Sequence, residues 1–400
     1  MTDKRSGVQR LIVPVGLVLP LIAFILVTFV IPLGSMVIQS VHDPEVAEVL
    51  PNTLNLLSEW DGTSVPSEEV FESMAQELVL SRESRTTGKV ATRVNRIASG
   101  TRSVFGKTAR RLERIETTEL RSAMIDIDDR WKDVELWIAI REAGREYTVK
   151  HYLHAVDLER ELDGGIHPVS EDQRIYNTLY LRTLFVSLAV TFFCFLIGYP
   201  IAYAIANVSD SMAKILLLIV LIPFWTSLLV RTTSWLVLLQ NQGVVNDILV
   251  WLGLVNDSDR LALIHNMTGT LVAMTHVLLP FMILPLYAVM RAIPTDYMKA
   301  AASLGANPAQ SFVRVYFPQS LPGISAGCLL VFILSLGYYI TPALVGGTKG
   351  QLISNMIAYH IQSSLNWGLA AAISVILLTG VFICYFIFDK WVGVDKLRLS

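Results

Sequence analysis

Six long apolar runs constrain the fold of this chain more than any other feature of its sequence. Each run has the length of about 20 residues that an α-helix needs to cross the hydrocarbon layer of a membrane. Backbone polar groups find no water in that layer, so a chain with apolar runs of this length crosses it as helices. The predicted spans are residues 11–38, 181–206, 212–239, 267–290, 320–345 and 367–389. The sequence therefore predicts an all-α integral membrane protein with six transmembrane helices.

The lysines and arginines beside short loops predict the orientation of these spans. With the N-terminus inside, the cytoplasmic segments hold Lys4, Arg5, Arg10, Lys214, Arg291, Lys299, Arg314, Lys390, Lys396 and Arg398. The short outer loops and their flanks hold only Arg231, Arg260 and Lys349. This bias places residues 1–10 and 390–400 in the cytoplasm. The first apolar run is too long for a signal peptide and lacks a small-residue cleavage site, so we expect it to remain as a span.

A long charged segment, residues 39–178, separates the first two spans and is predicted to lie outside the membrane. It carries most of the chain's 34 acidic residues. Its apolar residues recur at helical spacing and predict several amphipathic helices. They are Val70, Met74 and Leu78, then Val90, Val94 and Ile97, and then Trp131, Val134, Trp137 and Ile140. The pattern is compatible with a packed domain or a partly mobile collar, and a disordered loop stays open around residues 81–89 and 163–173.

A short polar stretch between two spans, residues 294–318, has the signals of two helices joined by a tight turn. Thr295 and Asp296 open a helix through Leu304, and Gly305 can adopt the left-handed conformation that ends it. Asn307-Pro308 begins a second helix, because Asn is a favoured N-cap and Pro a favoured first residue. Gln310 completes a capping box, and we expect Pro318 to stop the helix. The prediction is a helix-turn-helix elbow on the membrane surface.

The elbow resembles the signature motif of the permease subunits of binding-protein-dependent ATP-binding-cassette importers. The matching residues are Lys299, Ala300, Ala301, Ala302, Leu304, Gly305, Ala306, Phe312 and Pro318. One departure is Lys299, which stands where the family usually has Glu. The resemblance covers residues 179–388 and implies an N-terminal helix followed by a five-helix type-1 permease core. It also implies that the elbow couples this chain to a separate ATPase, which binds the ATP, so this chain has no catalytic residue, cofactor or metal of its own.

Several segments are similar to the spermidine/putrescine branch of that family. They include the run from Arg231 to Trp235, Gly243-Val244-Val245-Asn246, and Gly346-Gly347. The resemblance implies polyamine import in a bacterial inner membrane, although another small organic solute stays open. It implies three partners besides the lipid bilayer: an ATPase dimer, a second permease subunit and a soluble periplasmic substrate-binding protein. Nucleic acid is excluded, because the elbow is tethered to apolar spans and has no basic cluster.

Polar and aromatic residues within the spans are candidates for the translocation path, since such groups in a membrane interior face protein or water. They are Trp225, Arg231, Trp235, His276, Tyr338, Tyr339 and Pro342. Each also has a structural alternative: the aromatics as interfacial belt residues, Arg231 as a headgroup anchor, and His276 as a partner of a backbone carbonyl. Gly337, Pro342 and Gly346-Gly347 are expected to interrupt the fifth span near its outer end, where it borders the path.

Three other patterns do not predict a site. Residues 100–108 resemble a phosphate-binding loop, but the spacing is one residue too long and the flanks are helical. His151 and His154 are adjacent on a helix face and could bind a metal with Asp157, although two histidines at this spacing in a polar segment are more often surface residues. The three cysteines lie in apolar runs and suggest no disulfide framework.

Two other classes of protein compete with the importer permease. A secondary transporter should show repeated halves and intramembrane acids, and neither is visible. A membrane-anchored sensor or assembly protein would give residues 39–178 the main role, but an anchor needs one or two spans and no elbow.

Overall fold

The computed structural model describes residues 16–114, 119–160 and 165–392. These form two compact units, each described separately below: Met1–Glu171 with Trp367–Ala372, and Asp172–Asn366 with Ile373–Ser400. The predicted cytoplasmic segment 1–10, the first residues of the span 11–38 and residues 393–400 of the predicted tail lie outside the described part of the chain.

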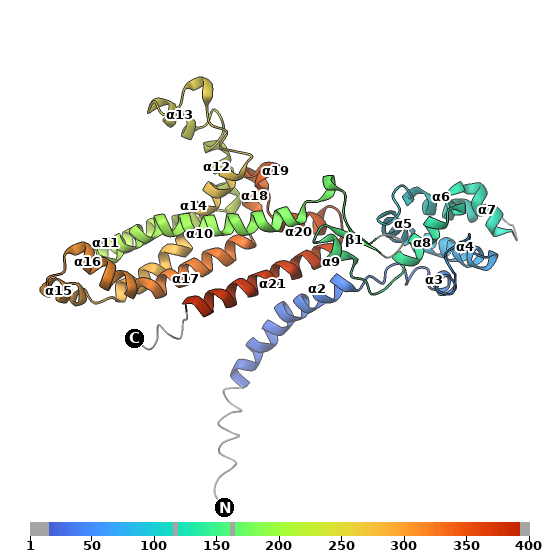
Figure 1. The fold of residues 1–400 in the computed structure, drawn as a ribbon, viewed down its shortest axis with the longest axis horizontal. Helices are drawn as coiled ribbons and strands as arrows, with labels where there is room; N and C mark the ends of the chain where they lie inside the picture. Colours follow the sequence, from blue (N-terminus) through green and yellow to red (C-terminus); the bar gives the residue numbers. More distant parts are fainter. Residues whose placement is uncertain (1–15, 115–118, 161–164, 393–400) are drawn as a thin grey trace, which may run out of the picture. The chain divides into compact units, whose positions relative to one another are not determined.

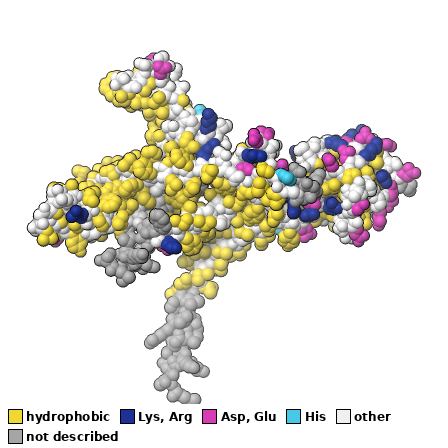
Figure 2. Space-filling view, viewed as in Figure 1, with side chains coloured by type: hydrophobic (Ala, Val, Ile, Leu, Met, Phe, Trp, Pro, Cys, Tyr) yellow, Lys and Arg dark blue, Asp and Glu magenta, His cyan; other side chains and the backbone are white. Residues whose placement is uncertain are grey.

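The first unit begins with the N-terminal span. The helix covers Gly16–Val41, including a π-helical turn at Leu26–Val30 (η1) and the helix α2, Ile31–Val41. It therefore ends three residues beyond the predicted limit at residue 38. Hydrophobic side chains cover it, as Figure 2 shows, whereas charged side chains gather on the segment that follows. An apolar surface of this kind is stable only in contact with lipid or another protein.

The segment after α2 is a packed helical domain, which we call the insert (Figure 1). Its largest buried side chains include Phe71, Trp131 and Trp137, and the rings of Phe71 and Trp137 lie 4.8 Å apart. The periodic apolar residues predicted for the insert lie in this core, except for Val134 and Ile97, which are half-buried. Residues 81–89 are ordered, so the disordered alternative is wrong there. The helices are α3 (Pro51–Ser58), α4 (Glu68–Glu83), α5 (Thr87–Asn95), α6 (Arg102–Leu112), α7 (Leu120–Ile127), η2 (Asp129–Lys132) and α8 (Val134–Ala143).

The two ends of the insert are joined at a neck, where the chain leaves α2 and later returns. The Asp43 amide donates to the carbonyl of Glu146 at 2.8 Å, and the Thr148 amide donates to that of Val41 at 2.8 Å. These bonds flank an antiparallel bridge between His42 and Tyr147. Beyond the neck lie α9 (Lys150–His154), an antiparallel pair of short strands, β1 (Leu158–Arg160) and β2 (Ile166–Pro168), and η3 (Glu171–Gln173).

Three long helices form the core of the second unit: α10 (Tyr176–Ala206), α14 (Met267–Ala292) and α17 (Phe317–Leu336). Glycine brings α17 close to α14, because a Cβ atom on Gly323 would lie 3.2 Å from the backbone of Leu286. Small residues at such a crossing let two membrane helices approach each other. The last span is α21 (Trp367–Val392). Shorter elements of this unit, besides those described in the following paragraphs, are α13 (Val244–Trp251), η4 (Asp257–Asp259), α18 (Ile340–Val345), α19 (Gly347–Gly350) and α20 (Ile353–Gln362).

The prediction of one continuous span at 212–239 is wrong. Helix α11 (Asp210–Trp225) and helix α12 (Leu228–Leu238) meet at an angle of 94°. Pro223 weakens the end of α11 because proline donates no backbone hydrogen bond. Thr226 then takes an extended conformation, and its hydroxyl donates to the carbonyl of Pro223 at 2.8 Å. In the described chain, five single helices are long and apolar enough to cross a membrane, and counting this bent pair as one broken span gives six.

The predicted span 320–345 differs at both ends. The helix breaks after Leu336, as the glycine and proline signals predicted, and restarts as α18 at Ile340. At its inner end, however, Pro318 does not stop the helix. Helical structure runs without interruption from Pro308 to Leu336. A wide π-helical turn at Phe312–Tyr316 (η5) precedes Pro318, and we attribute the continuity to this turn, which makes room for the proline ring.

Candidate functional site

The elbow has the predicted helix-turn-helix geometry. Helix α15 (Thr295–Ser303) ends at Gly305, which has a φ of +89°. Asn307 then caps α16 (Pro308–Ser311): its side chain accepts from the Gln310 amide at 2.8 Å, and the Gln310 side chain accepts from the Asn307 amide at 3.1 Å. These bonds satisfy backbone groups that a helix end would leave without partners. The turn is therefore stabilised locally and keeps its shape while exposed.

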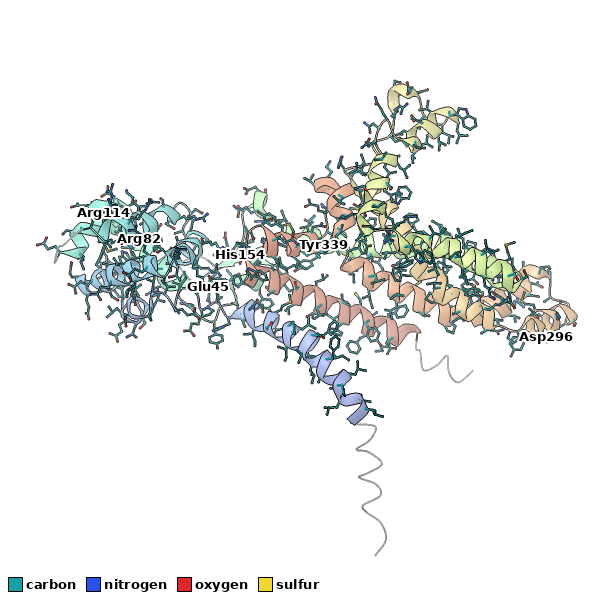
Figure 3. The ribbon with its side chains drawn as sticks, turned by 180° about the vertical axis from the view of Figure 1, so that it is seen from behind. Glu45, Arg82, Arg114, His154, Asp296 and Tyr339 are labelled. Atoms are coloured by element: carbon teal, nitrogen blue, oxygen red, sulfur yellow. The ribbon has the colours of Figure 1, made fainter. Side chains whose placement is uncertain are left out.

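The tip of the elbow faces away from the rest of its unit. Leu304 is 90% exposed, and nothing lies near a Cβ atom built on Gly305. Figure 3 shows Asp296, in α15, at the opposite end of the second unit from Tyr339. Lys299 forms an ion pair with Asp296 at 2.9 Å, but both side chains are more than 70% exposed. Such a pair contributes little stability and leaves the lysine available to another protein.

The remaining predicted coupling residues divide between the surface and the base of the elbow. Ala300, Ala302 and Pro318 are exposed, whereas Ala301 and Ala306 are half-buried. Phe312 is half-buried and packs against the core of the second unit. The base of the elbow is therefore anchored, while its tip presents a surface of small and apolar groups.

The aromatic partners of Phe312 were missed by sequence reasoning. Tyr203 meets the Phe312 ring edge-on at 5.5 Å, and Tyr316 stacks on it at 5.7 Å. Tyr199 completes the group at 6.2 Å. Tyr199 and Tyr203 are four residues apart and so lie on one face of α10. That spacing was the available signal, but it does not indicate which element the face meets.

Trp235 of α12 and His276 of α14, two of the predicted path residues, are in contact, and Arg231 and Tyr338 lie nearby. Trp235 donates from Nε1 to His276 Nδ1 at 3.0 Å, which assigns the His276 proton to Nε2. The positive charge of Arg231 interacts electrostatically with both His276 and Tyr338. Its Nε atom is buried and has no hydrogen-bond partner among the described residues. This polar cluster presents hydrogen-bond donors and one positive charge within an apolar unit.

The other three path candidates lie differently. Pro342 is buried beside Thr341, whose hydroxyl lies 3.3 Å from that of Thr232 and ties α18 to α12. Tyr339 is 39% exposed, and its carbonyl accepts from the Asn355 side chain at 2.8 Å. Trp225 is 81% exposed at the end of α11 and does not join the polar cluster. The exposure of Trp225 favours the alternative of an interfacial belt residue.

The segment resembling a phosphate-binding loop is part of a helix. Residues 102–108 lie in α6, and Lys107 forms an ion pair with Asp128 at 3.3 Å. Trp131 donates to the Thr108 hydroxyl at 2.9 Å inside the core of the insert. The charges of Arg130 and Lys107 lower the pKa of Asp128 to about 2, chiefly through its hydrogen bond with Arg130. The lysine and threonine of the pattern thus have structural partners, and this segment forms no nucleotide site.

His151 belongs to a buried charged cluster at the neck. Asp43 lies 3.2 Å from Arg93, 3.4 Å from Lys150 and 3.8 Å from His151. Burial opposes ionisation of Asp43, but His151 and the two cations outweigh it and hold the Asp43 pKa well below its usual range. Burial also lowers the pKa of His151. The described residues contain no group of three side chains placed to hold a metal, so the structure gives no support for a site at His151 and His154.

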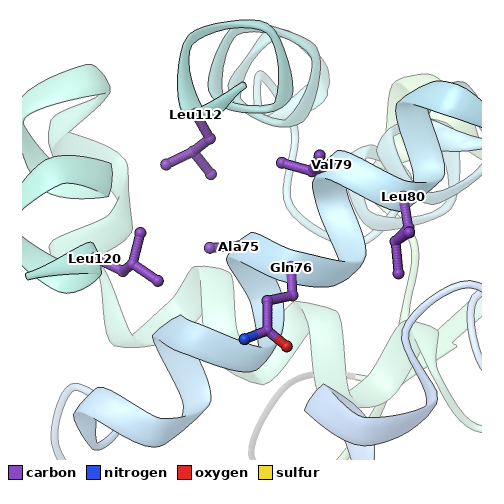
Figure 4. A pocket seen from close by; sticks show the side chains of 6 residues that line it. All are labelled: Ala75, Gln76, Val79, Leu80, Leu112 and Leu120. Atoms are coloured by element: carbon purple, nitrogen blue, oxygen red, sulfur yellow. The ribbon is translucent and has the colours of Figure 1, made fainter. Parts of the chain in front are cut away.

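The insert also has a shallow cavity of about 420 Å³, shown in Figure 4. Its lining comes from α4, α6 and α7 and consists of Ala75, Gln76, Val79, Leu80, Leu112 and Leu120. Gln76 is the only polar side chain in this lining. Small-molecule sites combine apolar walls with several convergent polar groups, so we do not place a solute here.

Comparisons with known proteins identify the second unit. The profile of the family described as "Binding-protein-dependent transport system inner membrane component" matches residues 180–393, more than half of the 400 residues. The spermidine/putrescine transport system permease protein PotB of Escherichia coli is 33% identical over 203 residues, which cover 51% of this chain and 73% of that protein. PotB of Haemophilus influenzae is 34% identical over 220 residues, covering 54% and 76%.

A crystal structure of a bacterial alginate ABC transporter, in complex with an alginate pentasaccharide-bound periplasmic protein, also resembles this chain. The match covers 54% of this chain and 77% of that one, with 19% identity and a TM-score of 0.45. The family profile and the curated relatives, together with the apolar helices, establish the class of the protein. This chain belongs to the family of binding-protein-dependent transport system inner membrane components, and it is a multi-pass permease subunit of such an importer.

Proposed function

We propose that this permease pairs with a second permease subunit, and that the elbow at residues 294–318 couples the pair to an ATPase dimer. The observation that carries the proposal is the exposed turn at Leu304 and Gly305, which is followed from Pro308 by one helical run into α17. A push on this turn acts directly on a membrane span. Closure of the ATPase pair would then tilt the spans and open the path alternately to each side. ATP is bound and hydrolysed by the partner, and this chain takes part in no covalent step.

A polyamine is the solute that the named relatives favour, since both PotB proteins are described as spermidine/putrescine permeases. Aromatic rings such as Trp235 and Tyr338 can attract an ammonium group through cation–π contacts. Arg231 opposes this, because it places a positive charge in the polar cluster. A soluble periplasmic substrate-binding protein would therefore supply most of the selectivity. The charge of Arg231 keeps a second candidate open, an organic solute that carries a carboxylate.

The orientation of the chain is part of the proposal. Both termini and the elbow lie in the cytoplasm, and the insert lies in the periplasm. The support is the excess of lysine and arginine in the proposed inner segments, including Lys214, Arg291 and Arg314. Single cysteines placed at Ser99, in the insert, and at Ser303, in the elbow, should test it. A membrane-impermeant thiol reagent added to spheroplasts should label only the first, and labelling of the second instead would reverse the orientation.

Reconstitution into proteoliposomes tests the coupling role. Wild-type protein should take up spermidine only when the ATPase, the second permease and the receptor are all present. Gly305→Val should insert and assemble normally but lose most uptake, because a β-branched residue is strained at a φ of +89° and reshapes the turn. Gly380→Val is the control, since a Cβ atom there meets nothing within 4 Å. Normal uptake by Gly305→Val would overturn the coupling role.

A further inference from the structure

The aromatic group at the base of the elbow joins it to a second helix besides α17. Phe312 follows α16 directly, and its ring meets Tyr199 and Tyr203, which both belong to α10. Tyr199 also lies 5.8 Å from Phe317, the first residue of α17. The elbow is thus continuous with α17 through the backbone and in contact with α10 through side chains.

A hydrogen bond reinforces the contact between the two helices. The Tyr199 hydroxyl lies 3.1 Å from Ser320 Oγ. Ser320 donates to the carbonyl of Phe317 at 2.7 Å, so its oxygen accepts from Tyr199. Tyr316, on the neighbouring side, meets Tyr203 edge-on at 5.1 Å. Edge-on and stacked aromatic pairs hold a defined orientation, which a cluster of aliphatic side chains does not.

The backbone around this group has two unusual features. Phe312 is the first residue of the π-helical turn η5, which leads into the regular helix α17, and π-helical turns are frequent at functional sites. Pro200 immediately follows Tyr199 within α10, and it leaves one backbone carbonyl without its usual donor. Tyr199 therefore holds α10 to the elbow at a point where α10 itself is weakened.

We propose that Tyr199 is a positioning residue that passes displacement of the elbow to α10, so that the elbow and the inner ends of α10 and α17 move as one body. The proposal rests on the coupling role of the elbow argued above. Motion is then taken up at the breaks in the structure, between α11 and α12 at residues 226–227 and after Leu336 in α17. Without Tyr199, α17 would still follow the elbow through the backbone, whereas the aromatic contact of α10 with the elbow would be left to Tyr203, and α10 would follow less closely.

Tyr199→Leu tests this in the reconstituted complex, with spermidine uptake and ATP hydrolysis measured on the same vesicles. Uptake per ATP hydrolysed should fall about twofold to thirtyfold, the range expected when one residue of a coupling network is removed. ATP hydrolysis itself should change less, because the ATPase sites are untouched. Phe192→Leu is the matched control, since Phe192 lies on the same helix with its ring 57% exposed.

Two milder variants keep the test decisive if Tyr199→Leu folds poorly. Tyr199→Phe and Ser320→Ala each remove the hydrogen bond but keep the aromatic group, and each should lower uptake per ATP by a smaller factor than Tyr199→Leu. Unchanged uptake per ATP in all three variants would overturn the proposal. So would an equal fall of uptake and ATP hydrolysis with a lower melting temperature, which a merely structural role predicts. Gly305→Val separates the two claims: if it uncouples transport while Tyr199→Leu does not, only the role of Tyr199 fails.

Discussion

Glu77 shows how one buried side chain organises the insert. Its carboxylate accepts from the backbone amides of Asn52 at 2.8 Å and Thr53 at 3.1 Å, at the beginning of α3. Glu77 lies on α4 and is only 5% exposed. A negative charge at a helix N-terminus satisfies free amides and interacts favourably with the helix dipole. The residue therefore links α3 to α4, in addition to the hydrogen bond of the Thr53 hydroxyl to Ser73 and the core that the two helices share.

Glu77→Ala should destabilise the insert by about 1–3 kcal/mol, because it leaves two backbone amides without partners. Thermal unfolding followed by tryptophan fluorescence measures this, since Trp131 and Trp137 lie in the core of the insert. Glu72→Ala on the exposed face of the same helix is the control and should change little. Equal melting temperatures for the two variants would show that the cap contributes nothing.

The neck makes the stability of the insert depend on pH. Burial lowers the His151 pKa below its usual 6.5, so the unfolded chain binds this proton first as the pH falls. The contribution of His151 to the free energy of unfolding is therefore complete above pH 6.5. It is lost as the pH falls below 6.5, by up to about 1.4 kcal/mol per pH unit. Asp43, whose pKa is also lowered, adds to the loss only below its usual 3.8.

Melting temperatures between pH 7 and pH 5 test this contribution. Wild-type protein should lose stability over that interval, and His151→Gln should reduce the loss, with the remainder coming from His154, whose pKa burial also lowers. His167→Gln, on the exposed strand β2, is the control and should retain it. If the melting temperature of His151→Gln falls with pH as steeply as that of the wild type, groups other than His151 cause the pH dependence.

At the scale of elements, the approach of α14 and α17 depends on Gly323. A Cβ atom there would lie 3.0 Å from the Val289 side chain and 3.2 Å from the carbonyl of Pro285. Because backbone atoms cannot move aside cheaply, Gly323→Leu should push the two helices apart and cost about 1–3 kcal/mol or more. The yield of monodisperse protein in detergent measures the effect. Gly380→Leu is the control and should give the wild-type yield, because a Cβ atom at Gly380 meets nothing within 4 Å. An equal loss of yield in both variants would indicate a general intolerance of larger residues.

The elements also show what could be read from the sequence. Hydropathy located the spans, because about 20 apolar residues have few alternatives to a membrane helix. The helix-capping residues located the elbow, because the left-handed turn at Gly305 and the cap formed by Asn307 depend only on residues close by in the sequence. The bend after Pro223 was missed because proline kinks some helices and ends others, and neighbouring elements decide which. The contact of Trp235 with His276 joins residues 41 positions apart, and local patterns carry no such information.

At the scale of the whole molecule, the insert and the permease core have separate hydrophobic cores. Trp131 and Trp137 lie in the first, and Cys194 and Met282 lie in the second. The sequence indicated helices in the insert but not their packing, because amphipathic helices of similar length can pack in several ways. The family profile matches only residues 180–393, so the insert is an addition to the part that defines the family.

Because the two ends of the insert are joined at the neck, we expect that the insert can be removed. Asp43 and Glu146 are hydrogen-bonded neighbours on antiparallel segments, so an Asn-Gly turn can replace residues 44–145 without moving either end. Asp43 would lose Arg93 but keep Lys150 at 3.4 Å. Because the permease core does not share the hydrophobic core of the insert, the shortened chain should still enter the membrane and copurify with the ATPase. If the shortened chain is degraded as strongly as Gly323→Leu, the insert is needed to fold the permease core. If the shortened chain assembles but does not support uptake, the insert acts in solute delivery.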